Sequence, residues 1–250
     1  MGTNATSAPS APPPLSTVER ITNVFFAPSK TFTDLNRDNS WWPAWLLIAV
    51  FAFLFVFAVQ KQVGWEQITK NEIAASQKAQ DRMEKLNPEQ RDQSIQVQSN
   101  IGKYISYCIP IFQLFIAAIV AAVLMATFNF GLGTEIKFNT ALAIVFYGWI
   151  PGILKSVLVA ISLFAGADPE GFNVNNPVAT NLGYFINRAD HPALAGLLSW
   201  FDIFTIWYII LFGIGFSCVS RVKRGTAIGV VAGWCALIAL VGAGFRAIFS

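Results

Sequence analysis

Five long stretches with almost no charged residues constrain this chain more than any other feature. Three of them contain no charge, and the other two contain one charge each. About 20 consecutive apolar residues are enough for a helix to cross the hydrocarbon layer of a bilayer. Each such stretch must be helical, because lipid offers no partner for unpaired backbone groups. The stretches are residues 39–60, 104–134, 138–167, 194–220 and 225–245.

The composition agrees with a chain that lies mostly in lipid. Hydrophobic residues make up 54% of the sequence and charged residues 12%, whereas soluble domains are about a quarter charged. A β-barrel needs alternating polar and apolar residues, and the unbroken apolar run 47–59 has no such alternation. We therefore predict an all-α integral membrane protein, a bundle of five transmembrane helices. The predicted spans are about 42–60, 104–130, 140–164, 196–219 and 226–248.

The segment before the first span predicts a disordered tail and then surface helices. Residues 1–14 are small, polar or proline residues that cannot bury a core, so we expect disorder there. The membrane domain is expected to cover residues 15–250 and to begin with a capping box formed by Ser16 and Glu19. The amphipathic pattern that follows favours helices on the membrane surface. The alternative is a packed cap over the mouth of the bundle. The expected surface contacts are Phe25, Phe26, Phe32, Trp41 and Trp42.

Two polar segments connect predicted spans. Residues 61–103 form a glutamine-rich insert with a thin apolar stripe, and Asn87 before Pro88 is typical of a helix start. We expect an extramembrane helical hairpin that serves as a solvated connection, with a partner-binding element as the alternative. The loop 165–193 is rich in Gly, Asn and Pro, which indicates turns in place of helix.

The basic residues of the shortest loop favour a cytosolic N-terminus. Arg221, Lys223 and Arg224 crowd the connection before the last span, and such clusters resist translocation. A count over all loops is nearly even and leans slightly the other way. We choose the orientation with the N-terminus inside.

The sequence offers little for catalysis, metal binding or nucleic-acid binding. It has one histidine, His191, and three cysteines within apolar runs, a set that does not make a metal site. Phosphate-binding and hydrolase motifs are not found. The net charge of +3 is spread over 17 basic and 14 acidic residues, which argues against a nucleic-acid surface. We expect no catalytic residue, no metal and no cofactor.

Two charges within predicted spans form a candidate intramembrane polar pair, Lys155 and Asp202. A charge within lipid is costly, about 2.5–3.5 kcal/mol on insertion scales, so it faces a cavity, the bundle interior or a partner. Their positions in the predicted spans place both within roughly 10–15 Å of the same membrane face. Pairing is therefore feasible. The alternative is that Lys155 extends alone to the headgroups and Asp202 bonds backbone groups.

Tyr147 and Pro151 form a candidate polar face with Lys155, because the three residues are four apart. Pro151 should bend the third span. A bend beside a charge is found in transporters but is also common in membrane bundles. Gly225, Gly229 and Gly233 are likewise four apart, which permits close helix approach. We expect packing within the chain, with a homo-oligomer as the alternative.

Several short patterns together resemble the Yip1 family of membrane proteins, particularly its bacterial branch. The resemblance covers roughly residues 18–248. It is carried by Phe26-Ala27-Pro28 with Phe32, by Trp41 and Trp42, by Phe128-Asn129-Phe130-Gly131, by Tyr147 with Pro151, and by Asp202 with Trp207 and Gly213-Ile214-Gly215.

The resemblance implies a five-helix bundle with a cytosolic N-terminus. Eukaryotic members are linked to vesicle traffic, Rab-type GTPases and other family members. The Asp-Leu-Tyr-Gly-Pro stretch of that branch is absent here, and the insert 61–103 departs from the compact family core. We predict a non-enzymatic protein of a bacterial cytoplasmic membrane that organises membrane or protein partners. The alternative is a small-solute or ion transporter that uses Lys155, Asp202 and Tyr147.

Overall fold

The computed structural model describes residues 13–249, so the predicted disordered tail 1–14 lies outside the described residues except for Pro13 and Pro14. The regular structure in this part of the chain is helical, apart from an isolated bridge between Asn181 and Asp202. The helices are α1 Thr17–Phe26, α2 Pro28–Asp34, α3 Trp42–Gln62, α4 Trp65–Ala74, α5 Gln77–Glu84, α6 Pro88–Tyr107, α7 Ile109–Ala126, the π-helix η1 Thr127–Gly131, α8 Phe138–Trp149, α9 Gly152–Phe164, the 3₁₀-helix η2 Leu182–Phe185, α10 Pro192–Leu198, α11 Ile203–Ser220 and α12 Arg224–Phe249.

Five helical segments within residues 13–249 are long and apolar enough to cross a membrane, which confirms the predicted all-α membrane fold. The third is made of α8 and α9, which meet at Ile150 and Pro151. The proline has no backbone N–H to donate, and the amide of Ile153 bonds the carbonyl of Ile150 three residues back at 3.0 Å. The segments are Trp42–Gln62, Ile109–Gly131, Phe138–Phe164, Ile203–Ser220 and Arg224–Phe245.

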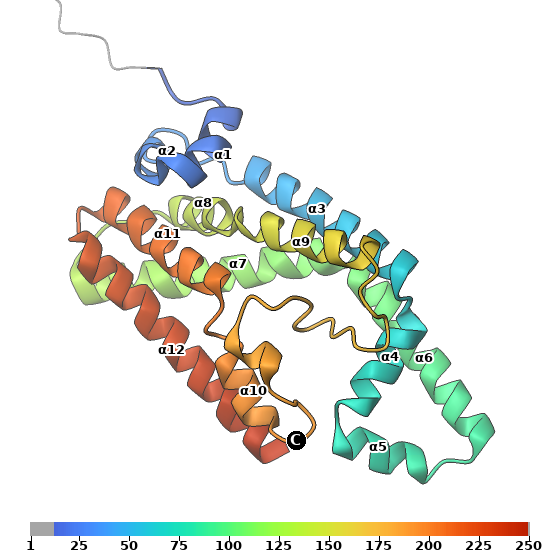
Figure 1. Cartoon of the computed structure of the whole chain (residues 1–250). Coiled ribbons are helices and arrows are strands. Elements are labelled where there is room, and N and C mark those ends of the chain that lie inside the picture. Colours follow the sequence, from blue (N-terminus) through green and yellow to red (C-terminus); the bar gives the residue numbers. More distant parts are fainter. Residues whose placement is uncertain (1–12, 250) are drawn as a thin grey trace, which may run out of the picture.

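The fourth span begins later than the sequence predicted. A single helix was expected over 196–219, but α10 ends at Leu198 and α11 begins at Ile203. Residues 194–201 are apolar apart from Ser199, so hydropathy alone cannot separate the two helices. Helix α10 instead packs against α12, outside the fourth span (Figure 1).

Helix α8 lies at the centre of the main core. Residues 140–148 of this helix are all buried, because α3, α7, α11 and the N-terminal segment surround it. The contact with α11 is close: a Cβ built at Gly148 would collide with the ring of Phe212. The core thus places α8, the first half of the third span, inside the bundle, whereas α9 and the other spans carry exposed apolar side chains on their outer faces.

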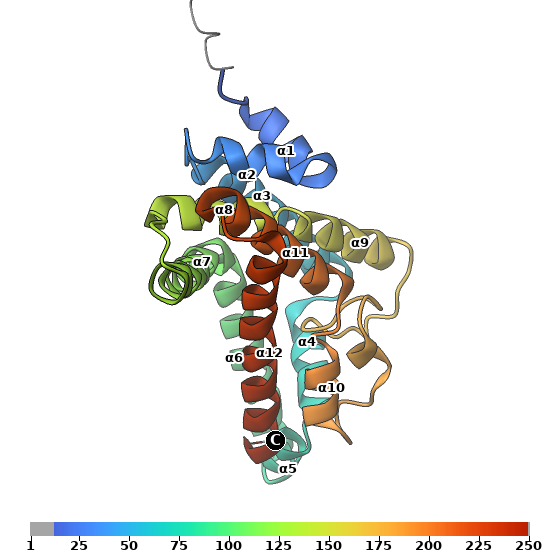
Figure 2. The same cartoon turned by 90° about the vertical axis from the view of Figure 1, so that its left-hand side faces the viewer.

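Helices α1 and α2 form a cap on one end of the bundle (Figure 2). Helix α2 packs on α11, and Phe32 is completely buried against it close to Gly215. Arg224, at the start of α12, donates from Nη2 to the hydroxyl of Ser29 at 3.0 Å. The cap and the connection between α11 and α12 therefore share one end of the molecule.

The insert and the loop 165–193 lie at the opposite end (Figure 1). The insert contains three helices, α4 to α6, where a two-helix hairpin was predicted, and α4 packs on α6. Asn71 donates to the carbonyls of Pro169 and Phe172, both at 2.8 Å, and Glu72 pairs with Arg188 at 3.1 Å. These contacts fasten the insert to the loop.

Candidate functional site

Lys155 and Asp202 meet at the end of the bundle that carries the insert. The Nζ atom of Lys155 lies 2.7 Å from Oδ2 of Asp202, and it also lies 5.9 Å from the ring centre of Phe204. The Asp202 side chain is 3% exposed and that of Lys155 is 29% exposed. The ion pair is therefore buried on the carboxylate side and open on the ammonium side.

Asp202 accepts hydrogen bonds from other groups besides Lys155. Its Oδ2 atom also accepts hydrogen bonds from the Thr180 hydroxyl at 2.7 Å and the Asn181 amide at 3.3 Å. Its Oδ1 atom accepts the backbone N–H of Phe204 at 2.8 Å, so Asp202 is the N-cap of α11. Asp202 thus lies at the start of α11, whereas the sequence predicted it about eight residues inside the fourth apolar stretch. Its contacts connect the loop, the third span and α11.

The predicted polar face on the third span is divided between the two ends of the molecule. Tyr147 is completely buried, and its hydroxyl lies beside the guanidinium group of Arg20 in the cap. Pro151 lies at the break between α8 and α9, and Lys155 reaches toward Asp202. The structure brings Lys155 and Asp202 together and separates Tyr147 from them.

A second charged cluster, which the sequence patterns did not predict, joins the cap to the bundle. Arg20 is 2% exposed, and its Nε atom donates to Oδ2 of Asp34 at 2.8 Å. Its Nη2 atom lies 2.7 Å from the same oxygen and 2.9 Å from Oδ2 of Asp38. Asp34 is buried and also accepts the N–H of Leu15 at 3.2 Å. The available signal was the helical spacing of Arg20 with the buried Val24, four residues later.

The charges in this cluster are mutually stabilised. Burial by itself lowers the pKa of Arg20, but the hydrogen bond with Asp34 and the charge of Asp38 raise that pKa above its ordinary value. The hydrogen bond from Ser40, assisted by Arg20, lowers the pKa of Asp38 against the opposing effect of partial burial. Both groups are therefore charged at neutral pH, and the guanidinium is compensated although it is out of water.

The aromatic residues expected at the membrane surface divide into buried and exposed groups. Phe32 is completely buried in the core, so it has no surface left for lipid. Trp41 stacks on Phe146 with ring centres 5.5 Å apart. Phe25 meets Trp207 edge to face at 5.8 Å. Phe26 and Trp42 remain exposed, at 84% and 57%. For Phe32 the structure therefore fits the packed cap, the alternative to helices on the membrane surface. Gly215 has no side chain, which leaves room for the Phe32 ring on α11.

Comparison with known families decides what kind of membrane protein this is. The model of the Yip1 domain matches residues 22–245, which is most of the sequence. The chain belongs to the Yip1 family. No curated protein and no solved structure matches it. This Yip1 protein is therefore an integral, multi-pass helical membrane protein that resides in a lipid bilayer.

The residues that carried the resemblance to Yip1 proteins hold the bundle together. Asn129 accepts from the backbone N–H of Ile136 at 2.8 Å and donates to its carbonyl at 3.0 Å, which closes the turn after η1. Phe128 stacks on Phe216 with ring centres 4.7 Å apart. A Cβ built at Gly213 would lie 2.7 Å from the Cα of Ile228, so glycine permits the close crossing of α11 and α12.

Proposed function

We propose that this Yip1-family protein is a non-enzymatic membrane protein that organises protein partners, and that α6 is the helix that a partner contacts. The family match and the five spans support a role within the membrane. The absence of catalytic motifs from the sequence supports a role without chemistry. The transporter alternative is not proposed, because Tyr147 lies beside Arg20 whereas Lys155 is engaged by Asp202.

The observation that carries this proposal is an apolar stripe on α6. Val97, Ile101, Tyr104 and Ile105 are each more than half exposed and lie on one face of the helix. The second span begins at Ile109, so Val97 lies about 18 Å along the helix from the span at 1.5 Å per residue. An apolar face that extends this far from lipid suits a membrane protein that packs on α6 and α7 together.

The proposal predicts that a photo-reactive residue on this stripe captures a protein in living cells. We expect benzoyl-phenylalanine at Ile101 to yield a discrete cross-linked species larger than the chain after irradiation. The measurement is immunoblotting, followed by mass spectrometry of the purified adduct.

The matched control is benzoyl-phenylalanine at Gln96, which is exposed on a different face of the same helix. It should give little or no adduct. Equal capture at Gln96 and Ile101 would indicate random collision and would contradict a docking face. An adduct of two copies of this chain would assign the stripe to a homo-oligomer and not to a separate partner.

We also propose that the cap faces the cytosol of a bacterial cell and that α4–α6 lie outside. The loop with Arg221 and Lys223, together with Lys30 in the cap, gives this end exposed basic residues, which favours the cytosolic side. We expect reporter fusions after residues 38, 136 and 223 to report the cytosol, and fusions after 80 and 180 to report the outside. A cytosolic signal at residue 80 would reverse the orientation.

A further inference from the structure

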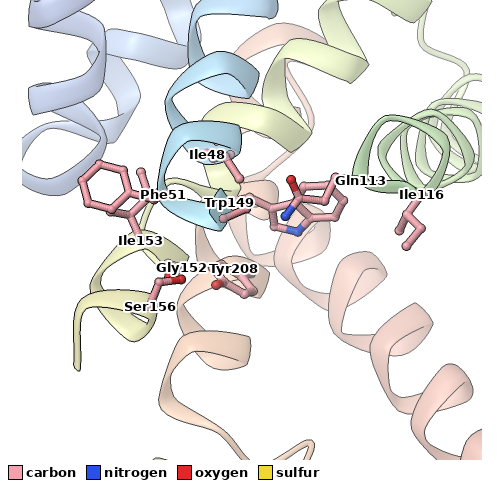
Figure 3. Close-up of a pocket in the computed structure, with 10 residues that line it drawn as sticks. Ile48, Phe51, Gln113, Ile116, Trp149, Gly152, Ile153, Ser156 and Tyr208 are labelled. Carbon is pink, nitrogen blue, oxygen red and sulfur yellow. The ribbon is translucent and has the colours of Figure 1, made fainter. Parts of the chain in front are cut away.

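A cavity within the membrane-spanning part of the bundle is not explained by the proposed partner binding. It lies among α3, α7, α9, α11 and the end of α8 (Figure 3). Its volume is about 330 Å³. A water molecule takes up about 30 Å³ in the liquid, and small-molecule sites begin near about 300 Å³. The cavity is therefore large enough for the polar end of a ligand.

The walls combine a broad apolar surface with three uncharged polar side chains. Gln113 comes from α7, Ser156 from α9 and Tyr208 from α11 (Figure 3). Tyr208 lies five residues, about 8 Å, inside the start of α11, so the site lies below the membrane surface. The rest of the wall is made by Ile48, Phe51, Ala52, Ile116 and Ile153 together with the ring of Trp149, whose indole N–H is a further donor.

The amide of Gln113 indicates what the cavity lacks. Its Oε1 atom is buried and accepts no hydrogen bond from the described residues. A buried amide oxygen without a donor is costly, and in lipid it cannot turn to bulk water. A ligand that donates a hydrogen bond, such as a hydroxyl group, would satisfy it. The mostly apolar walls suit a lipid better than a cluster of water molecules.

Two further observations narrow the class of ligand. None of the lining side chains is ionised, and Lys155, which precedes the lining residue Ser156, is neutralised by Asp202 at 2.7 Å. A neutral head group therefore fits the site better than a phosphate. Ile116 is 52% exposed on a membrane-spanning helix, so the rim of the cavity opens toward lipid.

We propose that this cavity binds the neutral, hydroxyl-bearing end of a membrane lipid of the diacylglycerol class. The lipid hydroxyl donates to Oε1 of Gln113, and the hydroxyls of Ser156 and Tyr208 lie within the same cavity for the ester oxygens. The acyl chains leave past Phe51 and Ile116 into the bilayer. This inference is independent of the proposed partner on α6.

The test is photolabelling of the full chain in lipid nanodiscs. The probe is a diacylglycerol with a diazirine near the head of one acyl chain. We expect labelled peptides from α3 and α7 around Phe51 and Ile116. Unlabelled dioleoylglycerol should compete, whereas dioleoyl phosphatidic acid and dioleoylglycerol with a methylated hydroxyl should not.

Variants separate binding from folding. Gln113→Leu should lower labelling about five-fold, the size expected for the loss of one hydrogen bond, while the melting temperature without the probe stays the same or rises because the unpaired oxygen is gone. Ala52→Phe should fill the cavity and abolish labelling. The matched control is Phe115→Leu, which changes a side chain of α7 that is 65% exposed and does not line the cavity, and it should label as the parent does.

Three outcomes would overturn the proposal. One is labelling of Gln113→Leu at the parent level. The second is equal competition by phosphatidic acid or by the methylated analogue, which would show that the cavity does not recognise the lipid hydroxyl. The third is labelling spread evenly over all lipid-facing helices, which would show that the probe meets the protein only as bulk lipid.

Discussion

Replacing Asp202 by leucine is expected to destabilise the protein more than replacing Lys155 by methionine. The leucine variant strands the Lys155 charge, removes the N-cap of α11 and leaves Thr180 without its acceptor. Because the Lys155 ammonium is 29% exposed, stranding it costs less than the about 3–5 kcal/mol typical of a fully buried pair, and loss of an N-cap costs about 0.5–2 kcal/mol. In Lys155→Met the carboxylate keeps three of its four hydrogen bonds, so we expect a smaller loss. The measurement is the melting temperature in mild detergent.

The double variant Lys155→Met with Asp202→Leu should regain only the part of the loss that comes from the stranded lysine. Asp202→Asn is the matched control, because it keeps an N-cap acceptor and changes the charge alone. It should fall between the parent and Asp202→Leu. Full recovery in the double variant would mean that the cap and the bond to Thr180 contribute nothing. Strictly additive losses would mean that the two side chains do not interact.

The sequence predicts the spans of this fold better than it predicts how the ends of the molecule are built. Spans follow from charge-free runs because lipid excludes charge, a constraint that needs no knowledge of neighbours. The start of α11 was misplaced because α10 is as apolar as a span, although it packs on α12 outside the fourth span. The two helices are separated by Asp202, which accepts the N–H of Phe204, and by the bond from the N–H of Ile203 to the carbonyl of Thr180.

The candidate sites depended on contacts between distant residues. Lys155 and Asp202 were singled out because a charge in a predicted span is rare, and such a signal is local. Arg20 and Asp34 gave no comparable signal, because charged residues in a surface helix are ordinary and their burial arises only when the cap docks on α8 and α11. The cavity at Gln113 was also missed, since residues of five separate helices form it.

The glycines of α12 also show that a sequence pattern does not identify which helices pack together. Gly225, Gly229 and Gly233 were expected to pack within the chain, yet a Cβ built at each of them meets nothing within 4 Å. The close crossing of α11 and α12 uses Gly213 instead. Spacing identifies a helix face that permits close approach, but it does not identify which neighbour approaches.

Replacing Arg20 by methionine is expected to release the cap from the bundle while the five spans remain folded. The change strands the buried Asp34 carboxylate, to which the N–H of Leu15 would still donate, and loss of a partner from such a pair costs about 3–5 kcal/mol. The thiol of Cys218 lies 3.9 Å from the carbonyl of Ser29 in α2, so it reports whether the cap is docked. In a chain that keeps only this cysteine, after Cys108→Ser and Cys235→Ala, we expect faster maleimide labelling of Cys218 in the Arg20→Met variant.

Lys30→Met is the matched control, because it also removes one positive charge from the cap but from an exposed side chain. It should leave the labelling rate unchanged.

The pKa of Asp38 is lowered below its ordinary value of 3.8, so the stabilising contribution of its charge is complete above that pH and is lost as the pH falls further. Labelling of the parent, corrected for thiolate fraction, should therefore be constant between pH 6 and 8. Equal labelling of Arg20→Met and the parent would show that Phe32 and its neighbours hold the cap without the charges, because the apolar contact of α2 with α11 would then suffice.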